Sequence, residues 1–188
     1  MMIGQFLKPT PTIWYSTKNR GLNRLEAPRV TMSGILDGVK IVDLSRILAG
    51  PLCTQMLSDL GAEVVKIEAP WGDDTRKWGP PFTTGFDGNE VAAYFLACNR
   101  GKQILTMNLK EQVAEIHELI KGADVVVENF KPGTLTRILG KLPDDVIVCS
   151  ISAYGQDGPR RDEPGYDIAL QARSGIMSIT GEQDGPPA

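Results

Sequence analysis

Histidine and cysteine are scarce in this chain. It has one histidine and three cysteines among 188 residues, and the cysteines stand far apart with no C-x-x-C pair: Cys53, Cys98 and Cys149. Such spacing predicts neither a disulfide framework nor a zinc site, so we expect no bound metal. We expect reduced thiols, as in the cytosol or the mitochondrial matrix, and small buried apolar residues rather than catalytic thiols.

Long apolar runs and the common nucleotide-binding motifs are also missing. No stretch approaches the roughly 18 apolar residues of a membrane span, so we expect no membrane partner. The sequence has neither G-x-G-x-x-G nor G-x-x-x-x-G-K-[ST]. A nicotinamide dehydrogenase and a P-loop nucleotide hydrolase are therefore unsupported.

Residues 1–34 contain almost no acidic residues, unlike the rest of the chain. This segment has one acid, Glu26, against five basic residues: Lys8, Lys18, Arg20, Arg24 and Arg29. The net charge of the whole chain is −3, so the residues after 34 carry a more negative charge than the chain as a whole. This argues against a nucleic-acid partner. The basic, acid-poor composition predicts a mitochondrial transit segment over 1–34; the alternative is a disordered leader with no address.

Short β-branched runs alternate with helical patterns from about residue 36, which is typical of βαβ units. The strands are expected at 39–44, 63–68, 104–109, 124–130 and 146–151. Helices are expected from Pro51 to about residue 60, over 111–121, from about 134 to 140 and over 167–180. The predicted class is α/β, a Rossmann-like, mainly parallel open sheet with flanking helices.

Three further patterns refine this picture. Leu52, Met56 and Leu60 recur every four residues along one face of the first helix. His117 falls on the apolar stripe of helix 111–121, which favours a helix residue at the edge of the core over a catalytic group. The composition of residues 70–90 predicts a long loop. We expect its aromatic side chains to keep this loop ordered.

Loops after the carboxyl ends of parallel strands are where ligands bind in such sheets. They occupy 45–51, 128–130 and 152–155. These loops and the strands beside them resemble CoA-transferase family III, the CaiB/BaiF type. The family includes formyl-CoA and carnitine CoA-transferases and the related α-methylacyl-CoA racemases. The matching motifs occur in order at 44–51, 59–68, 73–76, 127–133 and 165–167. Residues 78–82 and 154–156 are most similar to members that transfer CoA from succinyl-CoA to glutarate.

The resemblance implies that Asp167 is the nucleophile. In this family an aspartate attacks an acyl-CoA thioester, forms a mixed anhydride, and then carries CoA as an aspartyl thioester to an acceptor acid. Covalent catalysis of this kind replaces one difficult exchange by several easier steps. An aspartate before a helix also has a commoner structural role as the N-cap.

The resemblance also implies a set of CoA-binding positions. The backbone of Ile47 matches a position that lies against CoA, and Asn129 with Phe130 matches a pair along the adenine and pantetheine path. Arg137 matches an arginine near the CoA phosphates, where the alternative is a solvated helix arginine. Met107 matches a hydrophobic CoA contact, although a methionine in a strand is more often part of the core. Acyl-CoA is then a substrate, and no permanently bound cofactor is expected.

Some positions depart from family patterns. Leu48 stands where formyl-CoA transferase has a glutamine. Tyr166 stands where the racemases have the histidine of a Gly-His-Asp triplet, so an α-methylacyl-CoA racemase is the weaker alternative.

Length is the largest departure, because family members continue into a second, smaller domain. We therefore expect residues 35–188 to form the N-terminal part of the large domain. A full-length protein would form an interlocked homodimer acting on an acyl-CoA and a small carboxylic acid. A third alternative is an inactive CoA-binding fragment.

Overall fold

The structure, a computed structural model, describes residues 34–85 and 88–186. The predicted leader, residues 1–34, lies outside the described residues except for Gly34. The described residues belong to one compact unit, which begins at Gly34.

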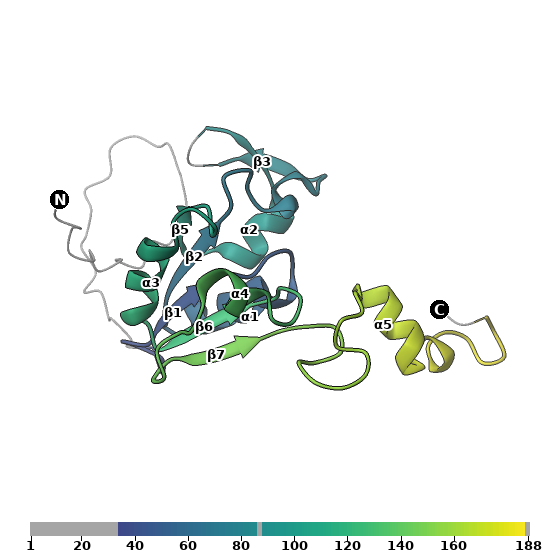
Figure 1. The fold of residues 1–188 in the computed structure, drawn as a ribbon. Coiled ribbons are helices and arrows are strands. Elements are labelled where there is room, and N and C mark those ends of the chain that lie inside the picture. The colour runs from purple at the N-terminus through teal and green to yellow at the C-terminus, as the bar shows by residue number, and fades with distance from the viewer. Residues whose placement is uncertain (1–33, 86–87, 187–188) are drawn as a thin grey trace, which may run out of the picture. The chain divides into compact units, whose positions relative to one another are not determined.

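Five parallel strands form the central sheet (Figure 1). In the order in which they lie side by side, they are β5 (Gln103–Thr106), β2 (Glu63–Glu68), β1 (Lys40–Asp43), β6 (Val125–Glu128) and β7 (Ile147–Ser150). The chain runs outward from β1 through β2 to β5, then returns to add β6 and β7 on the other side of β1. The predicted α/β class and all five predicted strands are confirmed, each observed strand lying within or one residue beside its expected range.

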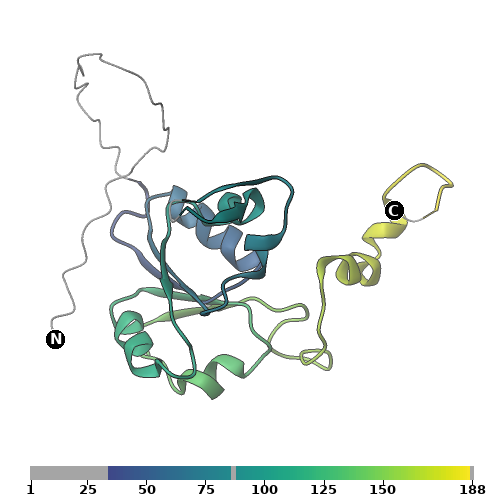
Figure 2. The same cartoon turned by 90° about the horizontal axis from the view of Figure 1, so that it is seen from above.

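Helices cover both faces of this sheet (Figure 2). One face carries α3 (Val113–Lys121) and α4 (Thr134–Leu139), and the other carries α1 (Ala49–Asp59) and α2 (Ala93–Asn99). The main core lies under α3 and α4 and is built from Val42, Leu44, Ile67, Met107, Ile116, Ile120, Val126, Leu135 and Leu139. A smaller core under α1 contains Ile41, Ala62, Val64 and Val127. Strands buried on both faces are continuous apolar runs, and β6 follows this pattern.

Helix α1 does not bury the stripe that its periodicity suggests. Leu52, Met56 and Leu60 are 41%, 61% and 48% exposed. The helix instead buries polar Thr54 and Gln55 against the sheet. The reason lies at the end of β1, where the Thr54 hydroxyl donates a hydrogen bond of 2.5 Å to the buried carboxylate of Asp43.

The segment 70–90 is more regular than the predicted loop. It contains the 3₁₀ helix η1 (Asp74–Lys77) and the strand β3 (Phe82–Thr84), which pairs with β4 (Glu90–Ala92) in an antiparallel hairpin. Aromatic contacts hold it against α2: the rings of Trp78 and Tyr94 lie 5.6 Å apart, edge to face. The predicted ordering by aromatic side chains is confirmed for the described part of this segment.

The predicted helix 167–180 is interrupted. Helix α5 (Asp167–Ser174) ends where Gly175 takes a left-handed conformation with φ of +82°, and the 3₁₀ helix η2 (Ile176–Ile179) follows. No residue of α5 is buried. Within residues 34–85 and 88–186, no helix has the length and hydropathy needed to cross a membrane.

Candidate functional site

The carboxyl ends of β1 and β6 lie side by side, because these two strands are paired in the sheet. After β1 the chain continues into one helical layer, and after β6 into the other. The crevice between such strands is the topological switch point at which open α/β sheets bind their ligands. Here it is formed by the loop 45–48 after β1 and by Asn129 and Phe130 after β6.

The side chain of Asn129 is hydrogen-bonded to the backbone of the neighbouring loop. Its Oδ1 accepts a hydrogen bond of 2.8 Å from the N–H of Arg46, and its Nδ2 donates one of 2.7 Å to the carbonyl oxygen of Arg46. The amide thus pairs with both polar groups of one residue, as a neighbouring strand would. Arg46 is also tied through its guanidinium to Asp74, at 2.9 Å.

Ile47 adopts a backbone conformation that β-branched residues rarely adopt. Its φ is +70°, in the left-handed region. A non-glycine residue held there costs on the order of 1–3 kcal/mol and persists only where its surroundings enforce it. The N–H of Ile47 donates a hydrogen bond of 3.2 Å to Oδ2 of Asp73. Asp73 follows β2 and Asn129 follows β6, and these two strands flank β1 in the sheet. Side chains from both sides of β1 therefore hold this loop.

A buried ion pair supports the same loop from below. Nζ of Lys66 lies 3.3 Å from Oδ2 of Asp73, and both side chains are fully buried. The ammonium also donates a hydrogen bond of 2.7 Å to the carbonyl oxygen of Ser45. Burial raises the pKa of Asp73, but hydrogen bonds from Thr75, the charge of Lys66 and the N–H of Ile47 outweigh it, so the pKa lies below its usual value.

A second buried pair lies under α1. Nζ of Lys102 is 3.1 Å from Oδ2 of Asp43, and it also donates hydrogen bonds to the carbonyl oxygen of Pro51 and to Oδ1 of Asn99. Burial lowers the pKa of Lys102, and the Asp43 carboxylate opposes this shift only in part. The three acceptors take up all three donors of the ammonium, so none is left for a ligand. This cluster therefore has a structural role.

A hollow of about 410 Å³ is lined by Lys110, Arg137 and Ile138. Arg137 is an exposed residue of α4, and Lys110 follows β5. Within the described part of the chain, neither side chain forms an ion pair. Two free cations at one hollow can pair with the oxygens of an anion.

Met107 and Phe130 belong to the core or its edge. Met107 is 9% exposed within the main apolar cluster, and Phe130 packs against the same cluster. Their assignment as CoA contacts stays a prediction, because a core position does not preclude a contact at the surface of the cluster.

Asp167 is the first residue of α5, exposed to solvent. The N-cap is Tyr166, so Asp167 does not have the structural role that competes with a nucleophile. Its Oδ2 accepts a hydrogen bond from Nε2 of Gln171, one turn later. Arg173 anchors the helix to the preceding loop through Glu163, at 3.0 Å, and through the ring of Tyr154, 5.7 Å away. None of these contacts links Asp167 to the switch point.

Two other predicted features have structural explanations. Nε2 of His117 lies 2.5 Å from the carbonyl oxygen of Leu139, at the edge of the core, as predicted. Burial raises the pKa of the Cys53 and Cys98 thiols, which disfavours the reactive thiolate.

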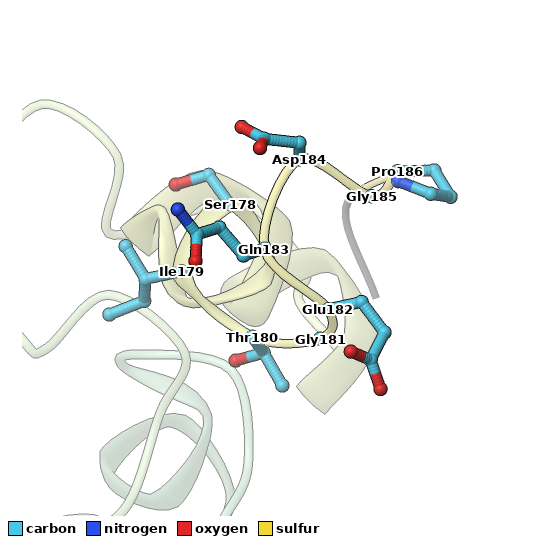
Figure 3. Close-up of a pocket in the computed structure, with 9 residues that line it drawn as sticks. All are labelled: Ser178, Ile179, Thr180, Gly181, Glu182, Gln183, Asp184, Gly185 and Pro186. Carbon is cyan, nitrogen blue, oxygen red and sulfur yellow. The ribbon is translucent and has the colours of Figure 1, made fainter.

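A hollow of about 380 Å³ is lined by residues 178–186 and includes none of the predicted site residues (Figure 3). Across the described ranges, no group of three or more histidine, cysteine, aspartate or glutamate side chains is arranged to hold a metal ion.

Sequence reasoning missed Lys66, Asp73 and Lys102. One signal was present: Lys66 shares one face of the strand with Val64 and Glu68, and its neighbours in sequence, Val65 and Ile67, are apolar. A lysine on a face that is otherwise buried requires a charged partner.

Known proteins match this chain over most of its length. The model of CoA-transferase family III matches residues 36–188. The succinate–glutarate CoA-transferase of Agrobacterium fabrum is 48% identical over 162 residues, 81% of this chain and 40% of the relative. The human succinyl-CoA:glutarate CoA-transferase is 46% identical over 171 residues, 85% of this chain and 38% of the relative.

A solved structure agrees. The crystal structure of a CaiB/BaiF family protein from Brucella suis has a TM-score of 0.78 and 46% identity, covering 83% of this chain and 43% of that one. The chain thus spans well under half the length of the relatives it matches. By its sequence and its fold, it belongs to CoA-transferase family III.

Proposed function

We propose that this chain takes part in moving CoA from an acyl-CoA, with succinyl-CoA as the expected donor, to a free dicarboxylate such as glutarate. The observation that carries the proposal is the family match over 36–188 together with relatives named for succinyl-CoA and glutarate. Other relatives are named for mesaconate and oxalate, so the acceptor is the finer part of the proposal.

Asp167 would act as the nucleophile. Its carboxylate attacks the thioester carbonyl of succinyl-CoA and expels the CoA thiolate, which leaves a mixed anhydride. The thiolate then attacks the aspartyl carbonyl, so that succinate leaves and an aspartyl-CoA thioester forms. The acceptor carboxylate attacks this thioester to give a second anhydride, and the thiolate takes the acceptor acyl group and frees Asp167. The position at the start of a helix supports the charged carboxylate, since N–H groups there favour an anion.

CoA itself would lie at the switch point. The backbone of Ile47 and the residues Asn129 and Phe130 edge this crevice, where ligands of such folds bind. Arg137, with Lys110 on the same hollow, supplies cations for the CoA phosphates. His117 gives the racemase alternative no support, because its Nε2 is engaged by the carbonyl oxygen of Leu139.

Trapping the aspartyl intermediate tests the chemistry. The chain is incubated with succinyl-CoA and hydroxylamine, and mass spectrometry locates the resulting hydroxamate. We expect it at Asp167, and we expect it to vanish in Asp167→Ala but to persist in Asp157→Ala, which changes an exposed carboxylate of the preceding loop. CoA binding without any adduct would favour the CoA-binding fragment over the transferase.

Substrate specificity needs a separate assay. Labelled glutarate with succinyl-CoA should give labelled glutaryl-CoA, with oxalate and mesaconate as competing acceptors. Adduct formation at Asp167 without glutaryl-CoA would keep the nucleophile and reject the acceptor.

The remaining proposals concern location and assembly. The composition of residues 1–34 supports import into mitochondria, which a fusion of this segment to a fluorescent protein tests directly. A homodimer is proposed from the family resemblance alone, and sedimentation of the purified chain tests it.

A further inference from the structure

From Ser45 to the N–H of Ile47, every backbone polar group of the loop 45–48 is hydrogen-bonded to a side chain. The N–H of Ser45 donates to Asp43 at 2.9 Å, and its carbonyl oxygen accepts from Lys66. Asn129 takes both polar groups of Arg46. These contacts fix the backbone up to the peptide that leads into Ile47, which has the unfavourable φ of +70°.

We propose that Asn129 is a positioning residue: it fixes the loop 45–48 with Ile47 in the left-handed conformation, so that the loop backbone is preformed for the ligand at the switch point. This inference rests on the proposed function for the identity of that ligand, CoA. It differs from the family resemblance, which puts Asn129 on the CoA path as a lining residue.

The geometry favours the indirect role. The Asn129 amide makes two hydrogen bonds of 2.8 and 2.7 Å to Arg46, the residue directly before Ile47. Fixing one residue fixes the peptide plane that it shares with the next, because that plane is rigid. Asp73 holds the N–H of that same plane at 3.2 Å. Two side chains therefore set the peptide that leads into the strained residue.

A left-handed conformation makes the proposal testable, because glycine adopts it without penalty. If Asn129 acts by enforcing the conformation of residue 47, its removal should matter less once residue 47 is glycine. If Asn129 instead contacts CoA directly, its removal should cost the same affinity whichever residue stands at 47. A double-mutant cycle separates the two.

CoA affinity is measured by calorimetry for the wild-type chain, Asn129→Ala, Ile47→Gly and the double variant. We expect Asn129→Ala to weaken CoA binding about tenfold, ~1.4 kcal/mol, in the wild-type background and less than about threefold in the Ile47→Gly background. Equal losses in both backgrounds, or wild-type affinity in Asn129→Ala, would overturn the inference.

Asn129→Asp provides a milder change should the alanine variant fail to fold. Aspartate can still accept from the N–H of Arg46, but its second oxygen faces the carbonyl oxygen of Arg46 and cannot donate. We expect an intermediate loss of CoA affinity that Ile47→Gly again reduces. If Asn129→Asp weakens CoA binding equally with isoleucine and with glycine at position 47, the positioning role is refuted.

Amide hydrogen exchange of the ligand-free chain separates this inference from the proposed function. The N–H groups of Arg46 and Ile47 should be protected in the wild type and exchange at least about tenfold faster in Asn129→Ala. If the wild type does not bind CoA, the proposed function fails, and exchange alone decides whether Asn129 fixes the loop. Unchanged exchange would refute the positioning role.

Discussion

Replacing Lys66 by methionine tests whether the buried ion pair beneath the loop 45–48 stabilises the fold. The side chains of Lys66 and Asp73 are both fully buried, 3.3 Å apart, and the ammonium also bonds the carbonyl oxygen of Ser45 at 2.7 Å. Methionine keeps the length of the side chain but removes the charge. The change leaves a carboxylate buried without its cation.

Removing one partner of a buried pair typically costs about 3–5 kcal/mol. Asp73 would keep three donors, the N–H and hydroxyl of Thr75 and the N–H of Ile47, so we expect the lower end of that range. A loss of about 3 kcal/mol corresponds to a fall in Tm of roughly 6–12 °C for a chain of this size. The free energy of unfolding is measured by urea titration with circular dichroism.

Lys121→Met is the matched control. Lys121 pairs with Glu118 at 2.6 Å, but the two side chains are 60% and 62% exposed. Surface pairs of this kind contribute less than about 1 kcal/mol. The double variant Lys66→Met/Asp73→Asn should recover part of the lost stability, because the uncompensated charge is gone. Equal losses for Lys66→Met and Lys121→Met, or no recovery in the double variant, would refute the reasoning.

Three further predictions concern stability. The pKa of Asp73 is lowered in the folded state, so its ionised carboxylate stabilises the fold. This stabilisation is complete above the unfolded pKa of about 3.9 and is lost as the pH falls through the folded pKa. The unfolding free energy of Asp73→Asn should therefore change less between pH 6 and pH 3 than that of the wild type. Gly133→Ala, at a φ of +76°, should cost about 1 kcal/mol in urea titration, whereas Gly122→Ala should be neutral or stabilising. Thr54→Val removes a donor from a buried carboxylate and should cost about 1–3 kcal/mol, whereas Met56→Gln on the exposed face should change the stability by less than about 0.5 kcal/mol.

The sheet could be predicted from the sequence because its strands are apolar runs bounded by turns. The loops 45–51 and 128–130 were expected to bear the ligand site, and the structure places the carboxyl ends of β1 and β6 side by side. The orientation of α1 could not be predicted in the same way. Its periodic leucines and methionine suggest a core face, but the buried carboxylate of Asp43 at the end of β1 draws Thr54 inward instead.

The contacts of the loop 45–48 could not be predicted for a different reason. Arg46 and Asn129 are 83 residues apart, and Ile47 and Asp73 are 26 residues apart. No local pattern encodes such pairs, since each depends on strand order. The family resemblance supplied Ile47 and Asn129 as separate positions, whereas their connection through the backbone of Arg46 required the structure.

The presence of isoleucine at position 47 is itself informative. Glycine would take a φ of +70° at no cost, but it would also allow the loop many other conformations in the absence of ligand. Isoleucine has fewer backbone conformations than glycine, so the hydrogen bonds of Asn129 and Asp73 have fewer alternative conformations to exclude. A loop that is already ordered loses less conformational entropy when a ligand binds. The strain at Ile47 is therefore consistent with a preformed binding surface, and a flexible glycine loop with the same contacts would bind the same ligand more weakly.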